Sequence, residues 1–439
     1  MSKHISGLKS IFISLIEYVI AVLIVLDCNT PYSRSITTDF HLPEIIAVFT
    51  FALFLLILDK LRIKRKTIIV IGSYFSAYFI AMLLLFFLSV DKNSPFAFLA
   101  RFLVMVPLLT IIQTAYQIRG NHYRLLLKYS NVVFALSVMS LAFWVLGSNM
   151  HVINPTNYLN ANWGRDYSYP SYFGLYFERQ IDSFLFYKGF RNIGIFCEAP
   201  MFSVNLVIAI AIKVFLQPYR IIDKNRKGYK SNIVKIIIMM VALITTLTTT
   251  GYIAIIFIVI AKYIIGKPKN ARIKVIKYLT GMLVALIGSR VAYGIYINKA
   301  ESVSWMVRLD DFSAGIKAWR RSPIWGNGYG DETVLKSFMS SFRSWNMGYS
   351  NSIFTVLAQG GILLFSAYLI PIIWGIVTAI KKKAYHILCF EGIMILEFIV
   401  TIFPYTFIML LLISFIVSYC MTVGSGDHKG VTFGTYRLT

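Results

Sequence analysis

Long apolar runs separated by short polar stretches extend from the start of the chain to about residue 422. A helix needs about 20 mostly apolar residues to cross a bilayer. The runs predict about twelve transmembrane helices, near residues 11–28, 43–59, 67–89, 96–117, 129–147, 199–217, 232–248, 250–266, 279–297, 352–379, 386–403 and 404–422. The expected fold is an all-α polytopic membrane protein, with residues 1–439 forming a single integral membrane domain.

Two connections, residues 148–198 and 298–351, are much longer than the others. Ordered loops of this length commonly carry function. Two apolar stripes at helical spacing lie in the second loop: Leu309, Phe312, Ile316 and Trp319, then Val334, Phe338, Phe342 and Trp345. We expect both loops to contain short amphipathic helices on the membrane surface. The first loop is also rich in aromatic residues, which favour either stacking on sugar rings or an interfacial aromatic belt.

Composition and charge agree with a membrane protein. Hydrophobic residues make up 57% of the chain and charged residues only 14%, against about 25% charged in a soluble domain. The net charge of +24 comes largely from basic loops that alternate onto one side, at residues 59–66, 218–230, 266–278 and 380–386. The positive-inside rule places that side and both termini in the cytoplasm, and the two long loops outside. The charge therefore sets topology, and no nucleic-acid partner is expected.

Arginine outnumbers lysine among the basic residues expected at or near the outer surface. Its planar guanidinium binds phosphate oxygens bidentately, although interfacial arginines also snorkel toward lipid headgroups. Arg101 and Arg290 lie inside predicted spans, where a charge is costly, which indicates pairing or function. The arginines concerned are Arg101, Arg165, Arg179, Arg191, Arg290, Arg308, Arg320, Arg321 and Arg343.

The stretch RNIGIFCEAP, residues 191–200, places a guanidinium and a carboxylate where the first long loop meets the next span. Apolar neighbours would raise the pKa of Glu198 and suit it to act as a general base. A glutamate directly before Ala-Pro is also typical of a helix start, where the helix dipole stabilises it. Both interpretations stay open at this point.

A glycine-rich stretch, SPIWGNGYGD at residues 322–331, resembles loops that wrap backbone N–H groups around phosphate. It lacks the Gly-Lys-Ser/Thr ending of a nucleotide-binding P-loop, and the topology places it outside the cell. Gly326, Gly328 and Gly330 would let the backbone approach a lipid-linked phosphate closely. Alternatively, the stretch simply turns the chain between two surface helices.

Metal and disulfide chemistry find no support in the sequence. The four cysteines form no CxxC pair, and they are far apart along the chain. Asp310 and Asp311 are adjacent rather than spaced as metal ligands, and their position favours the start of an amphipathic helix. No metal or other cofactor is expected.

The second half of the chain resembles the superfamily of O-antigen ligases and Wzy-type polysaccharide polymerases. The resemblance covers roughly residues 190–380. It rests on Arg308, Trp319 and the SPIWGNGYG stretch, then on Ser350-Asn351-Ser352 and LAQGGI at residues 357–362. An Arg-x-x-Gly entry to a mid-chain span, here Arg191 to Gly194, and the polar turn at residues 248–251 are also similar. Ligases of the family carry a histidine just before the asparagine, where this chain has Ser350.

The resemblance implies inverting glycosyl transfer on the outer face of a bacterial plasma membrane. The donor is a growing glycan on undecaprenyl pyrophosphate, and a sugar hydroxyl of the next lipid-linked repeat unit attacks it. The expected catalytic residues are Glu198, Arg191 and Arg308, and no metal is needed if arginines stabilise the developing charge. The residues expected to bind substrate are Arg101, Arg290, Arg320, Gly326, Gly328, Gly330 and Asn351.

Because the family histidine is missing, the resemblance favours a repeat-unit polymerase, for O-antigen or capsule, over a ligase. Its partners would be lipid-linked oligosaccharides, the bilayer, a chain-length regulator and a flippase. A ligase acting on another acceptor stays open. A lipid-linked oligosaccharide flippase is a further alternative, although such transporters tend toward short loops and internal repeats.

Overall fold

The computed structural model describes residues 2–35, 46–50, 52–53, 65–89, 95–163, 166–184, 187–217, 227–265, 303–343 and 348–424, with isolated positions between 275 and 290. Helices dominate these residues. The membrane-type helices are α1 (Ser2–Asp27), α3 (Arg65–Ser89), α4 (Pro95–Phe98) continuing through η1 (Leu99–Met105) into α5 (Val106–Ile118), α6 (Arg124–Phe143) with η2 (Trp144–Asn149), α7 (Ala199–Ala211) with η3 (Ile212–Leu216), α8 (Lys227–Thr245), α9 (Thr249–Ile265), α13 (Ser352–Lys381), α14 (Tyr385–Val400) and α15 (Phe407–Gly424).

Seven helices of the described part are long and apolar enough to cross a membrane: Ser10–Asp27, Arg65–Ser89, Pro95–Ile118, Arg124–Asn149, Ala199–Leu216, Ser352–Lys381 and Phe407–Gly424. The chain is therefore a mostly helical, polytopic membrane protein. The shorter helices α8, α9 and α14 lie where three more spans were predicted. The predicted spans near 43–59 and 279–297 lie largely outside the described residues.

Two helices form the centre of the bundle. All residues of α15 from Phe407 to Thr422 are buried, and α7 is buried along nearly its whole length. A helix that is apolar all round belongs in a core, and α15 packs against α5, α13 and α1. By contrast, α3 exposes large apolar side chains such as Phe87 and Ile80, as expected where lipid covers the protein.

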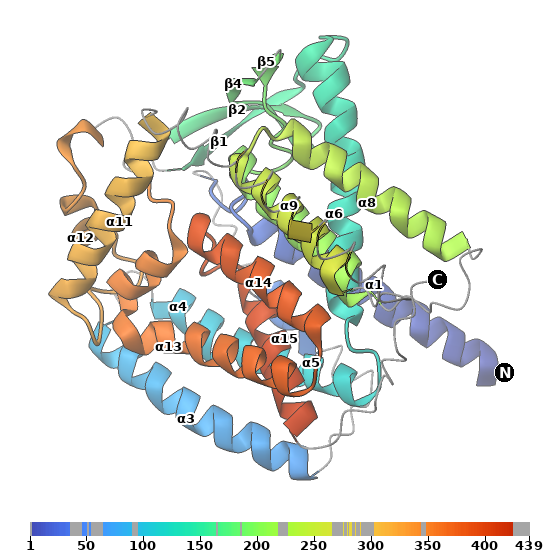
Figure 1. Cartoon of the computed structure of the whole chain (residues 1–439), viewed down its shortest axis with the longest axis vertical. Helices are drawn as coiled ribbons and strands as arrows, with labels where there is room; N and C mark the ends of the chain where they lie inside the picture. The colour runs from blue at the N-terminus through green and yellow to red at the C-terminus, as the bar shows by residue number, and fades with distance from the viewer. Residues whose placement is uncertain are drawn as a thin grey trace.

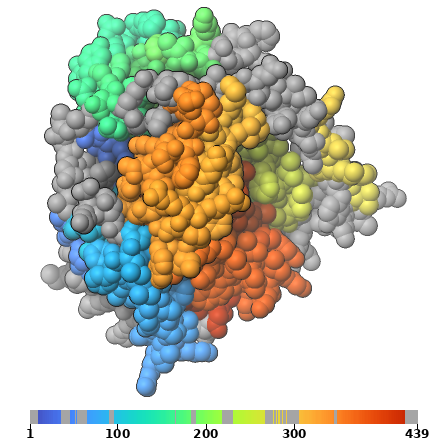
Figure 2. All heavy atoms as spheres, turned by 90° about the vertical axis from the view of Figure 1, so that its left-hand side faces the viewer, coloured from blue at the N-terminus to red at the C-terminus, as the bar shows by residue number. Residues whose placement is uncertain are grey.

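Both long loops lie at the same end of the bundle. Figure 1 shows the strands at the top and the helices α11 (Val303–Arg321) and α12 (Thr333–Ser337) at the left, whereas α1 begins at the lower right. Figure 2 shows α11 and α12, in orange, covering one face of the molecule below the green first loop. We call this end of the bundle the loop end.

The first long loop forms β-strands, so the expectation of amphipathic helices in residues 148–198 was wrong. Strands β1 (Asn157–Asn162), β2 (Asp166–Tyr172) and β3 (Tyr176–Phe177) make an antiparallel sheet, and β4 (Ile181–Phe184) pairs with β5 (Tyr187–Phe190). Asn157 pairs with Ser171 and Asn162 with Asp166. Tyrosines that pack on a pleated surface favour strands, and this property overrode the helical interpretation.

The second loop contains the predicted amphipathic helix, α11, with its faces reversed. Leu309 and Phe312 are exposed, while Asp311, Ala314 and Ala318 are buried. Small residues allow close packing against α13: a Cβ on Gly315 would lie only 2.5 Å from Cβ of Phe354. The apolar stripe is therefore free to face lipid.

Two details of the second loop differ from expectation. Asp310 and Asp311 lie in the middle of α11 rather than at its start, because the helix begins at Val303. The second stripe is not one helix but α12 followed by the short turn η4 (Ser341–Arg343), and Trp345 lies outside the described residues. After α12 ends at Ser337, Ser340 donates its N–H to Asp310, at 3.1 Å.

Helix α13 is broken at Gly361, whose φ of 60° and ψ of −161° are not helical. The glycine-rich stretch fills the break. Backbone N–H groups of Asn327 and Gly328 donate to the carbonyls of Ala358 and Gln359, at 2.8 and 3.0 Å. In return, Ile362 and Leu363 donate to the carbonyls of Pro323 and Ile324, at 2.8 and 3.3 Å. Residues 362–381 alone have the length of a span.

Candidate active site

Glu198 lies at the loop end, directly before α7. It occupies the N-cap position with extended backbone angles, but its side chain makes no capping hydrogen bond. The indole of Trp163 hydrogen-bonds the Glu198 carboxylate instead. Burial raises the pKa of Glu198 above its usual 4.5, while Arg179, Trp163 and Arg191 act in the opposite direction. The position of Glu198 therefore fits the helix-start interpretation. Its side chain does not cap the helix and is available for another role.

Arg191 reaches the same place from the end of strand β5. Its Nε donates to the carbonyl of Thr246, at 2.8 Å, and Nη1 lies 3.7 Å from the half-exposed carboxylate of Asp182. Burial lowers the pKa of Arg191, and attraction to Asp182 and Glu198 opposes that effect. The structure thus brings Arg191 and Glu198 together, as the sequence predicted.

The Arg-x-x-Gly turn holds this arginine in position. Asn192 donates its backbone N–H to the Thr245 carbonyl and its Nδ2 to the Thr245 hydroxyl, both at 3.0 Å. Gly194 has a φ of 58°, and a Cβ there would meet the Phe202 ring at 3.2 Å. The loop is therefore fixed both to α8 and to α7.

Arg308 lies in different surroundings. It is half-buried on α11, and no described residue accepts a hydrogen bond from it. Burial lowers its pKa, while the carboxylates of Asp311 and Glu397 attract its charge. Glu397 is buried near the end of α14. Arg308 therefore faces carboxylates other than Glu198.

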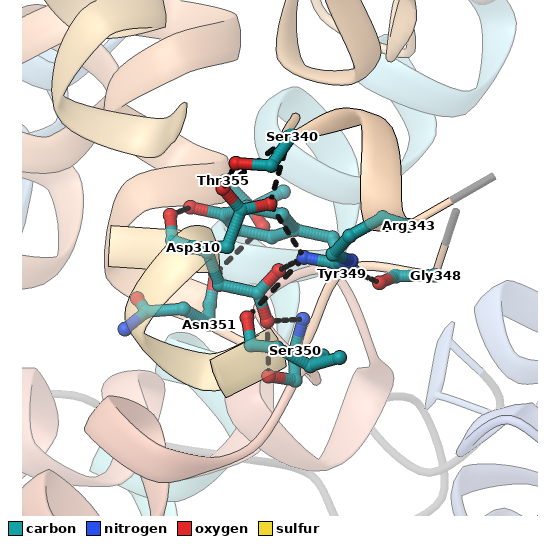
Figure 3. A network of polar contacts seen from close by, with 10 residues as sticks. Asp310, Ser340, Arg343, Gly348, Tyr349, Ser350, Asn351 and Thr355 are labelled. Carbon is teal, nitrogen blue, oxygen red and sulfur yellow. Dashed lines mark hydrogen bonds and ion pairs between the residues drawn. The ribbon is translucent and has the colours of Figure 1, made fainter. Parts of the chain in front are cut away.

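Asp311, which attracts Arg308, belongs to a buried polar network. Figure 3 shows Asp310, Arg343 and Ser350 of this network. Arg343 is fully buried, with Nη1 at 2.5 Å from Oδ1 of Asp311 and 3.4 Å from Oδ2 of Asp310. Ser350 donates both its N–H, at 3.0 Å, and its hydroxyl to Asp311. Arg343, counted from sequence among the phosphate-binding candidates, is engaged by these aspartates.

The linker between α14 and α15 connects the two sides. The Ser352 hydroxyl donates to the Thr401 carbonyl at 2.5 Å, and Asn29 donates to the Ile402 carbonyl at 3.1 Å. The Cys197 N–H in turn donates to the Asn29 carbonyl at 3.0 Å. Asn29, which is bonded to the residue before Glu198, and Ser352, at the start of α13, thus both contact the linker between α14 and α15.

The remaining predicted residues have varied positions. Arg101 lies in the π-helical segment η1 and donates to the Tyr329 hydroxyl at 3.0 Å. Asn351 caps α13 by accepting from the Phe354 N–H at 3.0 Å. Arg290 and Arg320 are exposed, and Arg165 lies outside the described residues.

The glycines of the loop are explained by packing. The N–H of Gly326 donates to the Ser322 carbonyl at 3.0 Å, and a Cβ on Gly326 would lie 2.3 Å from the backbone of Gln359. The Gly328 N–H donates to the Gln359 carbonyl, while Gly330 is exposed with a φ of 88°. The geometry therefore supports the turn interpretation for Gly326 and Gly328.

Sequence reasoning placed Trp163 only among the aromatic residues of the first loop and Arg179 only among the outer arginines. Both act on the Glu198 carboxylate from segments that follow strands, 35 and 19 positions earlier in the chain. The available signal was the density of aromatic residues around the arginines of the first loop. It could not indicate which ring would lie beside the carboxylate.

Comparison with known proteins supports the resemblance seen in the sequence. Residues 235–369 match the family model described as O-Antigen ligase. The matched segment contains α11, the glycine-rich stretch and most of α13. No match was found among curated proteins. Residues 235–369 are thus similar to the O-antigen ligase family, which supports the resemblance to the superfamily of O-antigen ligases and Wzy-type polymerases.

Proposed function

We propose that this protein is a polysaccharide polymerase that joins oligosaccharide repeat units carried on undecaprenyl pyrophosphate. The observation that carries the proposal is the state of Glu198, a carboxylate with a raised pKa whose side chain neither caps its helix nor forms an ion pair within the described residues. Such a group is suited to accept a proton. Arg179 and Arg191 lie in its surroundings, as an anionic leaving group requires.

In the proposed reaction, the carboxylate of Glu198 takes the proton from the attacking sugar hydroxyl. The new glycosidic bond forms as the bond to the pyrophosphate breaks, with inversion at the anomeric carbon. Arg191 and Arg308 neutralise the charge that develops on the leaving group. The reaction takes place at the loop end of the bundle, on the outer face of a bacterial plasma membrane, with both termini cytoplasmic.

A ligase is the second candidate, because the matched family is described as O-Antigen ligase. Against it stands Ser350, which replaces the histidine of ligases and whose hydroxyl is engaged by Asp311. A chain-length regulator and a flippase are proposed partners of the polymerase.

The test uses purified protein in proteoliposomes supplied with lipid-linked single repeat units and no other acceptor. A polymerase produces a ladder of products on a gel, whereas a ligase leaves the single repeats unchanged. Glu198→Gln should block chain growth, and Arg191→Lys should lower the rate by about 100-fold because the bidentate contact is lost.

The matched control is Glu178→Gln, on the same loop, which removes a carboxylate bonded to the Tyr172 hydroxyl at 2.9 Å. It should retain the ladder. Normal polymerisation by Glu198→Gln would mean that Glu198 only begins α7 and that the base lies elsewhere.

A further inference from the structure

Arg34, in the segment after α1, lies beside the Glu198 site although no sequence motif marks it. Its carbonyl accepts from the N–H of Asn162 on β1 at 2.8 Å, and Ser35 forms a bridge with Ala161. Its Nη2 donates to Oδ1 of Asn29 at 2.7 Å. The guanidinium carbon lies 5.3 Å from the ring centre of Trp163, the residue that bonds Glu198. Backbone and side chain are thus both held by neighbours.

Arg179, like Arg34, is held by an aromatic ring and by hydrogen bonds to neighbouring residues. Its guanidinium carbon lies 3.3 Å from the ring centre of Tyr167. Nη1 donates to the Tyr169 hydroxyl at 2.6 Å and to the Cys197 carbonyl at 3.4 Å. An aromatic face fixes the plane of a guanidinium and leaves its edge N–H groups available.

These contacts leave donors unused. Nε and Nη1 of Arg34, and Nε and Nη2 of Arg179, donate to no described residue. No described carboxylate forms an ion pair with either arginine. We call Arg34 and Arg179, with the rings of Trp163 and Tyr167, the arginine shelf.

Hydrogen bonds link the two arginines to the segment that precedes Glu198. Asn29 accepts from Arg34 through its side chain and from the Cys197 N–H through its carbonyl, and the Cys197 carbonyl accepts from Arg179. Arg191 adds a third cation next to Glu198. Arg308, by contrast, is surrounded by the carboxylates of Asp311 and Glu397. Three arginines therefore lie around Glu198, together with Asp182 beside Arg191 and Asp27, which attracts Arg34.

We propose that the arginine shelf binds the diphosphate of a lipid-linked substrate next to Glu198, as an oxyanion site additional to Arg191. The proposal rests on the proposed function. Two stacked cations match a group that carries two or more negative charges. The shelf also lies near the ends of α1 and α7, where the headgroup of a lipid whose tail is in the bilayer would lie.

The experiment is isothermal titration of the full-length protein, in nanodiscs of phosphatidylcholine, with inorganic pyrophosphate and separately with galacturonate. We expect saturable binding of pyrophosphate, weakened about 10-fold or more by Arg34→Ala and by Arg179→Ala. Tyr167→Leu should weaken it as well. The surface variant Lys336→Ala should bind like the wild type.

Unchanged pyrophosphate affinity in both Arg→Ala variants, with unaltered melting temperatures, would overturn the proposal. So would galacturonate binding as tightly as pyrophosphate, because the shelf would then recognise a carboxylate. Titration does not depend on turnover. Glu198→Gln protein should bind pyrophosphate at least as tightly as the wild type, whether or not that variant polymerises, so failure of the shelf and failure of the proposed base are distinguishable.

Discussion

The carboxylate of Glu198 accepts a hydrogen bond from Trp163 and none from the backbone of the helix that it begins. This separates the position of the residue, a helix start, from the use of its side chain. Because the indole stabilises only the charged form, the pKa of Glu198 depends on a residue outside the helix.

We expect the polymerisation rate to rise with pH through the pKa of Glu198, above the usual 4.5, because the base must be deprotonated. Trp163→Phe removes a hydrogen bond to the charged form, so the acidic limb of the pH profile should shift to higher pH. Initial rates at a series of pH values measure this shift. Lys336→Ala is the control, and an acidic limb unmoved by Trp163→Phe would separate Glu198 from the proton transfer.

Arg343→Ala should destabilise the α11 region strongly. The substitution leaves the buried carboxylates of Asp310 and Asp311 without their cation, which typically costs about 3–5 kcal/mol. Lys336→Ala breaks an exposed pair with Glu332, at 2.9 Å, and should cost about 1 kcal/mol or less. Thermal unfolding in detergent compares the two, and equal losses would contradict the role given to the buried network.

Ser350→Ala should leave substantial polymer. The hydroxyl bond to Asp311 is lost, but the backbone N–H of residue 350 keeps its bond to the same carboxylate. A destabilisation of about 1 kcal/mol is expected. Gel analysis of polymer at matched protein levels tests it, and complete loss of polymer would assign this serine a direct part in the reaction.

Gly326→Ala should destabilise the protein more than Gly120→Ala. Both glycines have positive φ, 74° and 81°, so both variants carry about 1–2 kcal/mol of backbone strain. Only at Gly326 would the new Cβ overlap a neighbour, at 2.3 Å, whereas nothing lies within 4 Å at Gly120. Overpacking adds about 1–3 kcal/mol. Similar melting temperatures for the two variants would argue against the tight joint.

Cysteine labelling tests the predicted sidedness. In a Cys389→Ser background, Tyr158→Cys and Glu332→Cys should react with a membrane-impermeant maleimide added to intact cells, because both positions are exposed at the loop end. Tyr385→Cys, exposed at the other end, should react only after permeabilisation. The reverse pattern would invert the orientation.

Much of the helical fold could be predicted from sequence, because hydropathy is a local property. The turns that precede α9 and α15 lie near the boundaries predicted at residues 248–251 and 403–404. The proximity of Arg191 and Glu198 was also predictable, since seven positions separate them along one loop.

The features that the sequence did not predict depend on contacts between residues far apart along the chain. The buried face of α11 was misjudged because Asp311 is neutralised by Arg343, 32 positions away, and because Gly315 accommodates Phe354. Arg34 was overlooked because its position is set by pairing with β1, in a loop whose strands the sequence did not indicate. A hydrophobic pattern carries no information on such pairings.

The break in α13 has a consequence for how the sequence can evolve. Residues 323 to 328 and the residues around Gly361 satisfy each other's backbone groups, two in each direction. Deleting either segment would leave backbone N–H and C=O groups of the other segment without hydrogen-bond partners. Each unpaired group costs several kcal/mol in an apolar setting. Neither segment can be deleted alone without harm. We therefore expect lineages to inherit or lose the glycine-rich stretch and the Gly-Gly pair together, as a single heritable character.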